Sequence, residues 1–272
     1  MKTKCFCLRK LMVGVLVLLL VAPPHLMAQS GGEENNSNFT QEQLSQLVAP
    51  IALYPDSLLS QILMASTYPL EVVESDRFVK ANAKLKGDAL DAALKEKTWD
   101  VSVKSLCHFP GVLGSMSEKL DQTTQLGDAF LGQQEEVMKT VQELRAKAHA
   151  EGNLETTKEQ TVVVENKVIV IETPDPQVIY VPTYNPTVVY GPWPYPAYPP
   201  YAWYYPPGMG LLTFGVGIAV GIGISNWSRC NWRNNSVNVN INRTANFNRN
   251  ANIHGGKGGD RKSTRLNSSH RL

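Results

Sequence analysis

The sequence predicts an α+β protein, in which an all-helical domain precedes a short β-rich segment and a glycine-rich apolar helix. Apolar residues recur at helical spacing from residue 39 to residue 153, and β-branched runs typical of strands then follow. Tyrosine, tryptophan and proline dominate next, up to residue 207, and lead into an uncharged run rich in glycine. These changes of composition mark the boundaries of the predicted segments.

Residues 1–28 have the three parts of a secretory signal peptide. Basic residues precede the apolar run Leu11–Ala22, and the small residue Ala28 marks the expected cleavage position. This run is short for a helix that crosses a hydrocarbon layer of roughly 30 Å, although an uncleaved anchor is the alternative. A polar, acidic leader over residues 29–38 follows. We therefore expect an exported protein of the periplasm or cell envelope.

The predicted helical domain covers residues 39–153. Thr40 and Gln43 have the spacing of a capping box at the start of its first helix. Tyr54-Pro55 and Tyr68-Pro69 each open a further helix, because proline is tolerated in the first turn.

The second half of this domain should contain a shorter helix over residues 88–97 and turns near Trp99 and Phe109-Pro110. One long helix is expected from Thr124 to Ala150, because its apolar residues fall on a single helical face. Gly152-Asn153 supplies its stop.

Two runs of β-branched residues follow the helical domain. Thr161–Glu165 and Val168–Glu172 flank Asn166-Lys167, which predicts a hairpin with a two-residue turn. Strand patterns continue at Gln177–Val181 and Thr187–Tyr190, where nearby prolines confine the strands to edges and turns. These four strands are expected to form one small sheet.

Aromatic residues and prolines are concentrated late in this β-rich and Pro/Tyr-rich segment, which spans residues 160–207. Eight of the ten tyrosines and eleven of the seventeen prolines lie between Pro174 and Pro207. The rings could stack on sugar rings or dock partner proteins, while proline keeps the chain extended and lowers the entropy cost of binding. A stiff spacer with rings at a membrane interface is the alternative. The candidate binding residues are Tyr190, Trp193, Tyr195, Tyr198, Tyr201 and Trp203.

Residues 208–227 are predicted to form a glycine-rich transmembrane helix. Small residues recur at four-residue spacing, which gives a helix a smooth face for self-association, and about 20 helical residues span roughly 30 Å. A buried glycine-rich segment or a loose linker is the alternative, since glycine costs about 1 kcal/mol per helical position. The candidate helix-packing residues are Gly215, Gly217, Ala219, Gly221 and Gly223.

The last two segments differ in charge from the rest of the chain. Residues 228–259 form a tail rich in asparagine and arginine, in which Ser236–Asn242 alternates like a strand, with a disordered tail as the alternative. Residues 260–272 read like the translation of a sequencing adapter, and we treat them as an artefact. Without them, residues 29–225 carry a net charge of −10 and residues 226–259 carry +5. No nucleic-acid-binding fold accompanies the cationic tail, so nucleic-acid binding is not expected.

No convincing catalytic set is present, and we expect neither an enzyme nor a metal site or cofactor. Glu71 and Glu74 can share a helical face, but a solvated face with a local ion pair explains them better. Cys107 and His108 are adjacent and so point in different directions, which favours a structural or free cysteine. Export would permit a disulfide between Cys107 and Cys230, but a membrane helix between them would separate the two thiols.

Several short motifs match one known family. They are Ala49–Asp56, Ala65–Val73, Leu126–Phe130, Val178–Pro186 and Val189–Pro192. Over roughly residues 40–250 the chain resembles the bacterial envelope family catalogued as domain of unknown function 3300. Phe78, Val101 and Gln122 replace the tryptophan, proline and tryptophan of that pattern. The resemblance implies an exported protein and brings no catalytic residues.

The sequence therefore predicts a non-enzymatic protein of the cell envelope, which acts as a membrane-tethered scaffold or interaction module. The expected partners are the membrane, a second copy of the chain, and a cell-wall polymer or another envelope protein. A module that binds the cell wall or a polysaccharide through the Tyr/Trp/Pro block is the alternative function.

Overall fold

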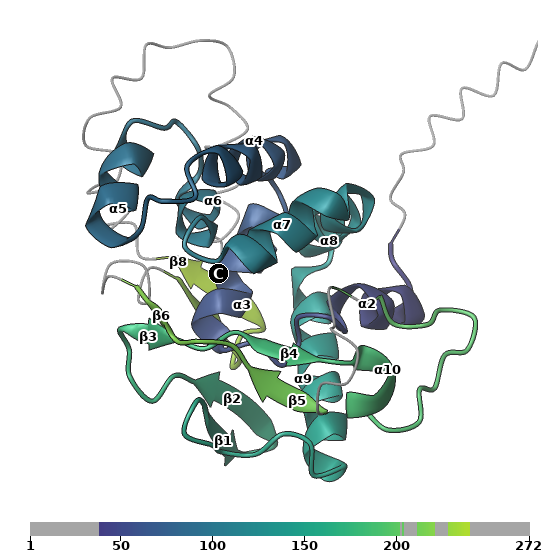
Figure 1. Cartoon of the computed structure of the whole chain (residues 1–272). Coiled ribbons are helices and arrows are strands. Elements are labelled where there is room, and N and C mark those ends of the chain that lie inside the picture. The colour runs from purple at the N-terminus through teal and green to yellow at the C-terminus, as the bar shows by residue number, and fades with distance from the viewer. Residues whose placement is uncertain (1–37, 202, 204–210, 221–227, 240–272) are drawn as a thin grey trace, which may run out of the picture. The chain divides into compact units, whose positions relative to one another are not determined.

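A computed structural model describes residues 38–201, 203, 211–220 and 228–239. The predicted signal peptide, almost all of the leader and the adapter-like segment lie outside these residues. The described chain is an α+β protein, as predicted: helices make up its first part, and pairs of antiparallel strands follow (Figure 1).

The helical part, which we call the helical body, extends to residue 150 and is held by one apolar core. The capping box at Thr40 and Gln43 is present, and Pro69 occupies the first turn of its helix, both as predicted. Its helices are α2 (Gln41–Val48), α3 (Asp56–Ala65), α4 (Pro69–Ala81), α5 (Gly87–Lys95), α6 (Val101–Leu106), α7 (Pro110–Glu118), α8 (Leu120–Gly132) and α9 (Gln134–Ala150).

The helical body differs from the prediction in two places. Helices α6 and α7 form where only turns were expected, because Asp100 caps the first by accepting from the Ser102 N–H and proline opens the second. The expected long helix is divided into α8 and α9 at Gln133. The Gln133 side-chain amide both donates to and accepts from the Phe39 backbone, which ties the break to the start of the body.

Close packing within the body requires glycine at one position. Gly127 of α8 lies against the backbone of Ser66, and a Cβ atom there would overlap the Ser66 carbonyl group. This contact brings together two of the motifs quoted above, Ala65–Val73 and Leu126–Phe130.

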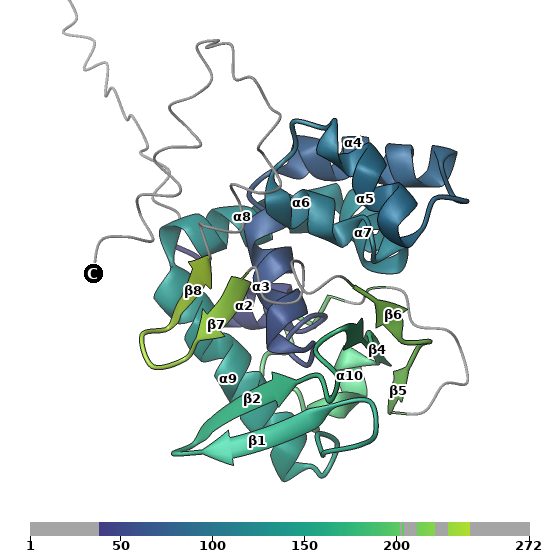
Figure 2. The ribbon, with the colours of Figure 1, turned by 90° about the vertical axis from the view of Figure 1, so that its left-hand side faces the viewer.

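The predicted hairpin is confirmed. Strands β1 (Thr161–Glu165) and β2 (Val168–Glu172) pair antiparallel, with Glu165 opposite Val168. Asn166 and Lys167 have φ values of 50° and 67°, as a type I′ turn requires. Helix α9 packs against β2, so the hairpin lies beside the end of the helical body (Figures 1 and 2).

The single four-stranded sheet was a wrong prediction. Strands β3 (Val178–Ile179) and β4 (Pro182–Tyr184) pair instead with strands from the apolar segment. The expected strand at Thr187–Tyr190 is replaced by the short helix α10 (Pro186–Val189), because Asn185 caps it and proline opens it.

The predicted helix at residues 208–227 is also corrected by the structure. Its described residues contain β5 (Leu212–Phe214), which pairs with β4, and β6 (Ile218–Ala219), which pairs with β3. Gly217 packs against Val178 and Tyr180 so closely that a Cβ atom would lie 2.6 Å from Val178 Cγ1. At this position, glycine serves a β contact and not a helix-packing face. Among the described residues, no helix is long and apolar enough to cross a membrane.

A second hairpin ends the described chain. Strands β7 (Ser228–Asn231) and β8 (Ser236–Val239) pair antiparallel, which resolves the open alternative in favour of a strand over residues 236–239. The hairpin packs on α3 (Figure 2), where the Ser228 and Ser60 hydroxyl oxygens lie 2.7 Å apart, and Val237 joins the apolar core. Chain that follows the apolar segment thus contributes to the same folded unit as the helical body.

Candidate functional site

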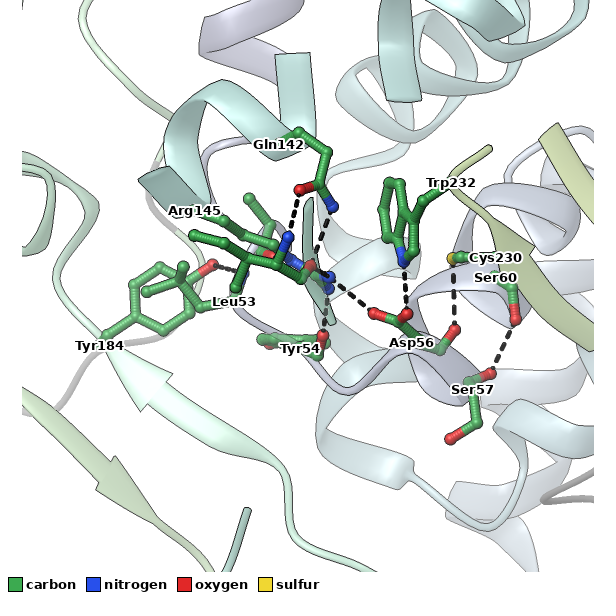
Figure 3. Close-up of polar contacts among 12 residues, drawn as sticks. Leu53, Tyr54, Asp56, Ser57, Ser60, Gln142, Arg145, Tyr184, Cys230 and Trp232 are labelled. Atoms are coloured by element: carbon green, nitrogen blue, oxygen red, sulfur yellow. Dashed lines mark hydrogen bonds and ion pairs between the residues drawn. The ribbon is translucent and has the colours of Figure 1, made fainter. Parts of the chain in front are cut away.

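A fully buried arginine lies where α9, β2 and the start of α3 meet. Arg145 is 0% exposed, and its Nε donates to the Ala52 carbonyl oxygen at 2.8 Å. Its Nη2 donates to the Tyr54 carbonyl oxygen at 2.9 Å, and its Nη1 to that of Ile169 at 2.9 Å and to Asp56 Oδ1 at 2.6 Å (Figure 3). A buried guanidinium is tolerated only when it is paired and hydrogen-bonded, and Arg145 meets both conditions.

The second carboxylate oxygen of Asp56 is bound by the C-terminal hairpin. Trp232 Nε1 donates to Asp56 Oδ2 at 2.6 Å, and the Arg145 guanidinium lies 4.8 Å from the centroid of the Trp232 ring (Figure 3). The Cys230 thiol donates to the Asp56 carbonyl oxygen at 3.5 Å. We call Asp56, Arg145 and Trp232 the buried charge centre. In it, the Arg145 guanidinium and the Trp232 indole N–H each donate to one carboxylate oxygen of Asp56.

A pocket of about 290 Å³ opens beside the buried charge centre. We call it the β2–β7 pocket, since its walls are the start of α3, the end of β2 with the chain after it, and β7. The residues that give it chemical character are Asp56, Ser57, Glu172, Arg229, Cys230 and Trp232. Three segments that are far apart in the sequence therefore form one cavity.

The cysteine in this pocket has a raised thiol pKa. Burial raises the pKa of the Cys230 thiol well above its ordinary value, and the Asp56 carboxylate raises it further, while Arg145 lowers it. Because the thiolate is the reactive form, the neutral thiol acts here as a hydrogen-bond donor. Within the ranges that the structure describes, no group of three or more His, Cys, Asp or Glu side chains could hold a metal ion.

Three of the six predicted binding residues pack toward the helical body. Tyr190 is only 2% exposed, and its hydroxyl donates to the Ala49 carbonyl oxygen at 2.6 Å. Trp203 lies edge-on to Tyr54 at a centroid distance of 6.4 Å, and the Tyr201 N–H donates to the Gln46 carbonyl oxygen. These contacts fasten the Pro/Tyr-rich segment onto the helices.

The other three lie on a loop that we call the aromatic loop, residues 191–199. Trp193 Nε1 donates to the Tyr198 carbonyl oxygen at 2.9 Å, and the rings of Trp193 and Tyr195 meet edge-on at 6.0 Å. Trp193 and Tyr195 are half-buried and Tyr198 is 36% exposed. Lys147 of α9 lies 5.8 Å from the Tyr195 ring centroid. The loop therefore presents three rings, and ring contacts hold two of them, Trp193 and Tyr195, in place.

The three described residues of the predicted helix-packing set do not form a helical face. Gly215 and Gly217 lie in the connection between β5 and β6, and Ala219 pairs with Val178 at the end of β6. Gly221 and Gly223 lie outside the described residues.

Two of the three acidic residues of α4, Glu71 and Glu74, support the chain that precedes α6. Glu74 Oε2 accepts from Trp99 Nε1 at 2.9 Å, and Glu71 Oε2 accepts from the Asp100 N–H. Their neighbour Asp76 forms an ion pair with Lys80. The local ion pair is therefore present, but Glu71 and Glu74 bind neighbouring chain and do not simply form the solvated face that was expected.

The cysteine and histidine pair is divided between two environments. Cys107 is 1% exposed, and burial raises its pKa to about 12. His108 Nε2 lies instead 2.9 Å from Asp91 Oδ1. Cys107 and Cys230 are both free thiols, so the disulfide considered above is absent from the described chain.

Sequence reasoning missed the buried charge centre. Its signal was present in α9: Arg145 lies four residues after Val141 and three before Ala148, on the apolar face of the helix. A charged residue on such a face is either a snorkelling side chain or a buried one with partners. The partners lie too far away in the sequence to be recognised.

The geometry defines an α+β protein in which strands from the second half of the chain close a polar pocket on a helical body. Family motifs provide the framework: Tyr184 and Tyr190, from two motifs, both donate their hydroxyl hydrogen to the Ala49 carbonyl oxygen of a third. The chain belongs to the family described as protein of unknown function (DUF3300), whose model matches residues 40–266. The predicted resemblance is therefore confirmed.

The chain is also similar to the uncharacterized protein YacH of Escherichia coli strain K12. The two are 46% identical over 134 residues, which cover 49% of this chain and 22% of YacH. The matched region thus spans about a fifth of the length of that relative. No solved structure matches the chain.

Proposed function

We propose that this protein is a non-enzymatic interaction module of the bacterial cell envelope, which contacts its partner through the aromatic loop. The fixed geometry of that loop is the observation that carries the proposal. Export rests on the signal-peptide pattern of residues 1–28.

The aromatic loop is anchored at both ends. Before it, the Tyr190 side chain is buried in the core. At its other end, the Gln46 side chain of α2 donates from Nε2 to the Pro199 carbonyl oxygen at 2.7 Å. The Gln46 backbone carbonyl oxygen accepts from the Tyr201 N–H. A loop that is already ordered loses little conformational entropy when it binds.

The exposed chemistry of the loop suits contact with another protein. Tyrosine and tryptophan are enriched at interfaces, where they bury large apolar areas and keep a polar group for hydrogen bonding. Lys147 beside Tyr195 adds a cation at the edge of this surface. A second copy of the chain or another envelope protein would use the surface as a scaffold contact.

A cell-wall polymer or polysaccharide is the second candidate partner. The specific observation in its favour is that Trp193 and Tyr195 are half-buried and meet with their ring planes 86° apart. Rings held in this way present apolar faces and edges to a sugar ring. A transmembrane anchor at residues 208–227 is not part of the proposal, because strands occupy its described residues.

Retention on purified peptidoglycan and crosslinking in whole envelopes test the two candidates together. The variant Trp193→Ala/Tyr195→Ala removes two loop rings, and Leu70→Ala removes a 76% exposed apolar side chain from α4 as a matched control. Retention that only the loop variant loses supports polymer binding, and a protein crosslink that only the loop variant loses supports scaffolding. If both variants behave like the wild type in both assays, the aromatic loop is not the contact surface.

A further inference from the structure

The β2–β7 pocket carries a second inference, which does not depend on the aromatic loop. Arg229 on β7 and Glu172 at the end of β2 both line the pocket, and both are exposed. Neither forms an ion pair within 4.0 Å in the described part of the chain. Two opposite charges therefore border one cavity without neutralising each other.

The third charge at this pocket is already used. Asp56 accepts from Arg145 through one carboxylate oxygen and from Trp232 through the other. The buried Arg145 guanidinium balances its negative charge, so the Asp56 carboxylate is not available to bind a charged ligand. Among the described residues that line the pocket, the charged groups left for a ligand are one cation, Arg229, and one anion, Glu172.

This arrangement selects a class of ligand by charge. A ligand with several negative groups would be repelled by Glu172, and one with several positive groups by Arg229. A molecule with one group of each sign matches both walls, and guanidinium binds carboxylate in a bidentate manner. The volume of about 290 Å³ is close to the lower end of small-molecule sites, roughly 300 Å³.

We propose that the β2–β7 pocket binds a small zwitterion, a free amino acid or a short peptide. The ligand carboxylate lies on the Arg229 guanidinium and the ligand ammonium group on the Glu172 carboxylate. Trp232 supplies an apolar wall and Ser57 a hydroxyl group for the rest of the ligand.

Calorimetric titration of the protein with three peptides tests this proposal. Alanylalanine carries both charges, N-acetyl-alanylalanine lacks the ammonium group, and alanylalanine amide lacks the carboxylate. We expect alanylalanine to bind and each blocked peptide to bind about tenfold more weakly, because each loses a charge-assisted hydrogen bond. Equal affinity for the three peptides, or binding of none at millimolar concentration, would overturn the proposal without any variant.

Two variants assign the charges to their walls. Arg229→Gln should remove the preference for alanylalanine over its amide, and Glu172→Gln should remove the preference over the N-acetyl peptide. Glu165→Gln, at the far end of the same β1–β2 hairpin, is the matched control and should keep both preferences. If a variant lowers the affinity for all three peptides by the same factor, Arg229 and Glu172 do not bind the charged ends of the ligand. Trp193→Ala should leave pocket binding unchanged, which separates this site from the aromatic loop.

Discussion

The buried charge centre and the rim of the β2–β7 pocket each hold an arginine and a carboxylate, but they use them differently. Arg145 is 0% exposed and makes all its contacts inside the protein, whereas Arg229 is exposed and lines the same cavity as Glu172. A buried pair must be complete before the protein is stable, while an exposed pair can stay open to a ligand. Burial thus distinguishes a structural charge from an available one.

Removing the buried arginine should have the largest effect. Arg145→Met leaves the buried Asp56 carboxylate without its cation and removes the donor to the Ala52 and Tyr54 carbonyl oxygens, while the Ile169 carbonyl oxygen keeps only Gln142 Nε2. We expect the free energy of unfolding to fall by about 3–5 kcal/mol, as measured by urea denaturation. A loss below about 1 kcal/mol is typical of an exposed site. It would show that Arg145 contributes no more to stability than the exposed Arg229 at the pocket rim.

Removing the indole N–H tests the link between the centre and the hairpin. Trp232→Phe keeps an aromatic ring but loses the hydrogen bond to Asp56, so we expect about 2 kcal/mol of destabilisation in urea unfolding. Trp99→Phe is the matched control, because the indole bond of Trp99 goes to the exposed Glu74. If Trp99→Phe lowers the free energy of unfolding as much as Trp232→Phe, the hydrogen bond to the buried Asp56 carboxylate contributes no more stability than the one to the exposed Glu74.

Alkaline pH should weaken the region around Cys230. Its pKa in the folded protein is raised above the ordinary 9.0, first by burial and then by the Asp56 carboxylate, so the folded state holds the thiol proton more tightly than the unfolded state. This contribution to stability is complete below about pH 9 and is lost as the pH rises further. Urea unfolding at increasing pH should show a smaller alkaline loss for Cys230→Ala. Parallel curves for the variant and the wild type would contradict the prediction.

The rim should have the smallest effect on stability. Arg229→Gln removes an exposed charge that has no ion pair among the described residues, so the free energy of unfolding should change by less than about 0.5 kcal/mol. Thermal and urea unfolding check this directly. A larger loss would mean that Arg229 supports the fold, and the contrast between the two arginines would disappear.

Local signals allowed much of the helical body and the first hairpin to be predicted. The capping box at Thr40 and the Asn166-Lys167 turn depend on residues within a few positions of each other, and both are present. The division at Gln133 was missed because it depends on Phe39, 94 residues away. Short-range patterns thus succeeded where the stabilising contact was itself short-range.

The apolar segment shows why the rest could not be predicted. Four-residue spacing of glycine suits a helix, but it is equally consistent with a strand connection in which a single glycine is needed for contact. Gly217 is required by Val178 and Tyr180, which no periodicity within residues 208–227 reveals. The candidate site was hidden in the same way, because Asp56, Arg145 and Trp232 come from three distant segments.

The distance along the chain between these partners also sets an order of assembly. Arg145 and Ile169 are 24 positions apart, whereas Trp232 and Asp56 are 176 apart. Closing a longer loop costs more entropy, so we expect the contact between Arg145 and Ile169 to form before the one between Trp232 and Asp56. Until the β7–β8 hairpin docks, Asp56 has one uncompensated oxygen and the pocket lacks a wall. A complete pocket therefore requires that the chain is folded at least as far as Trp232.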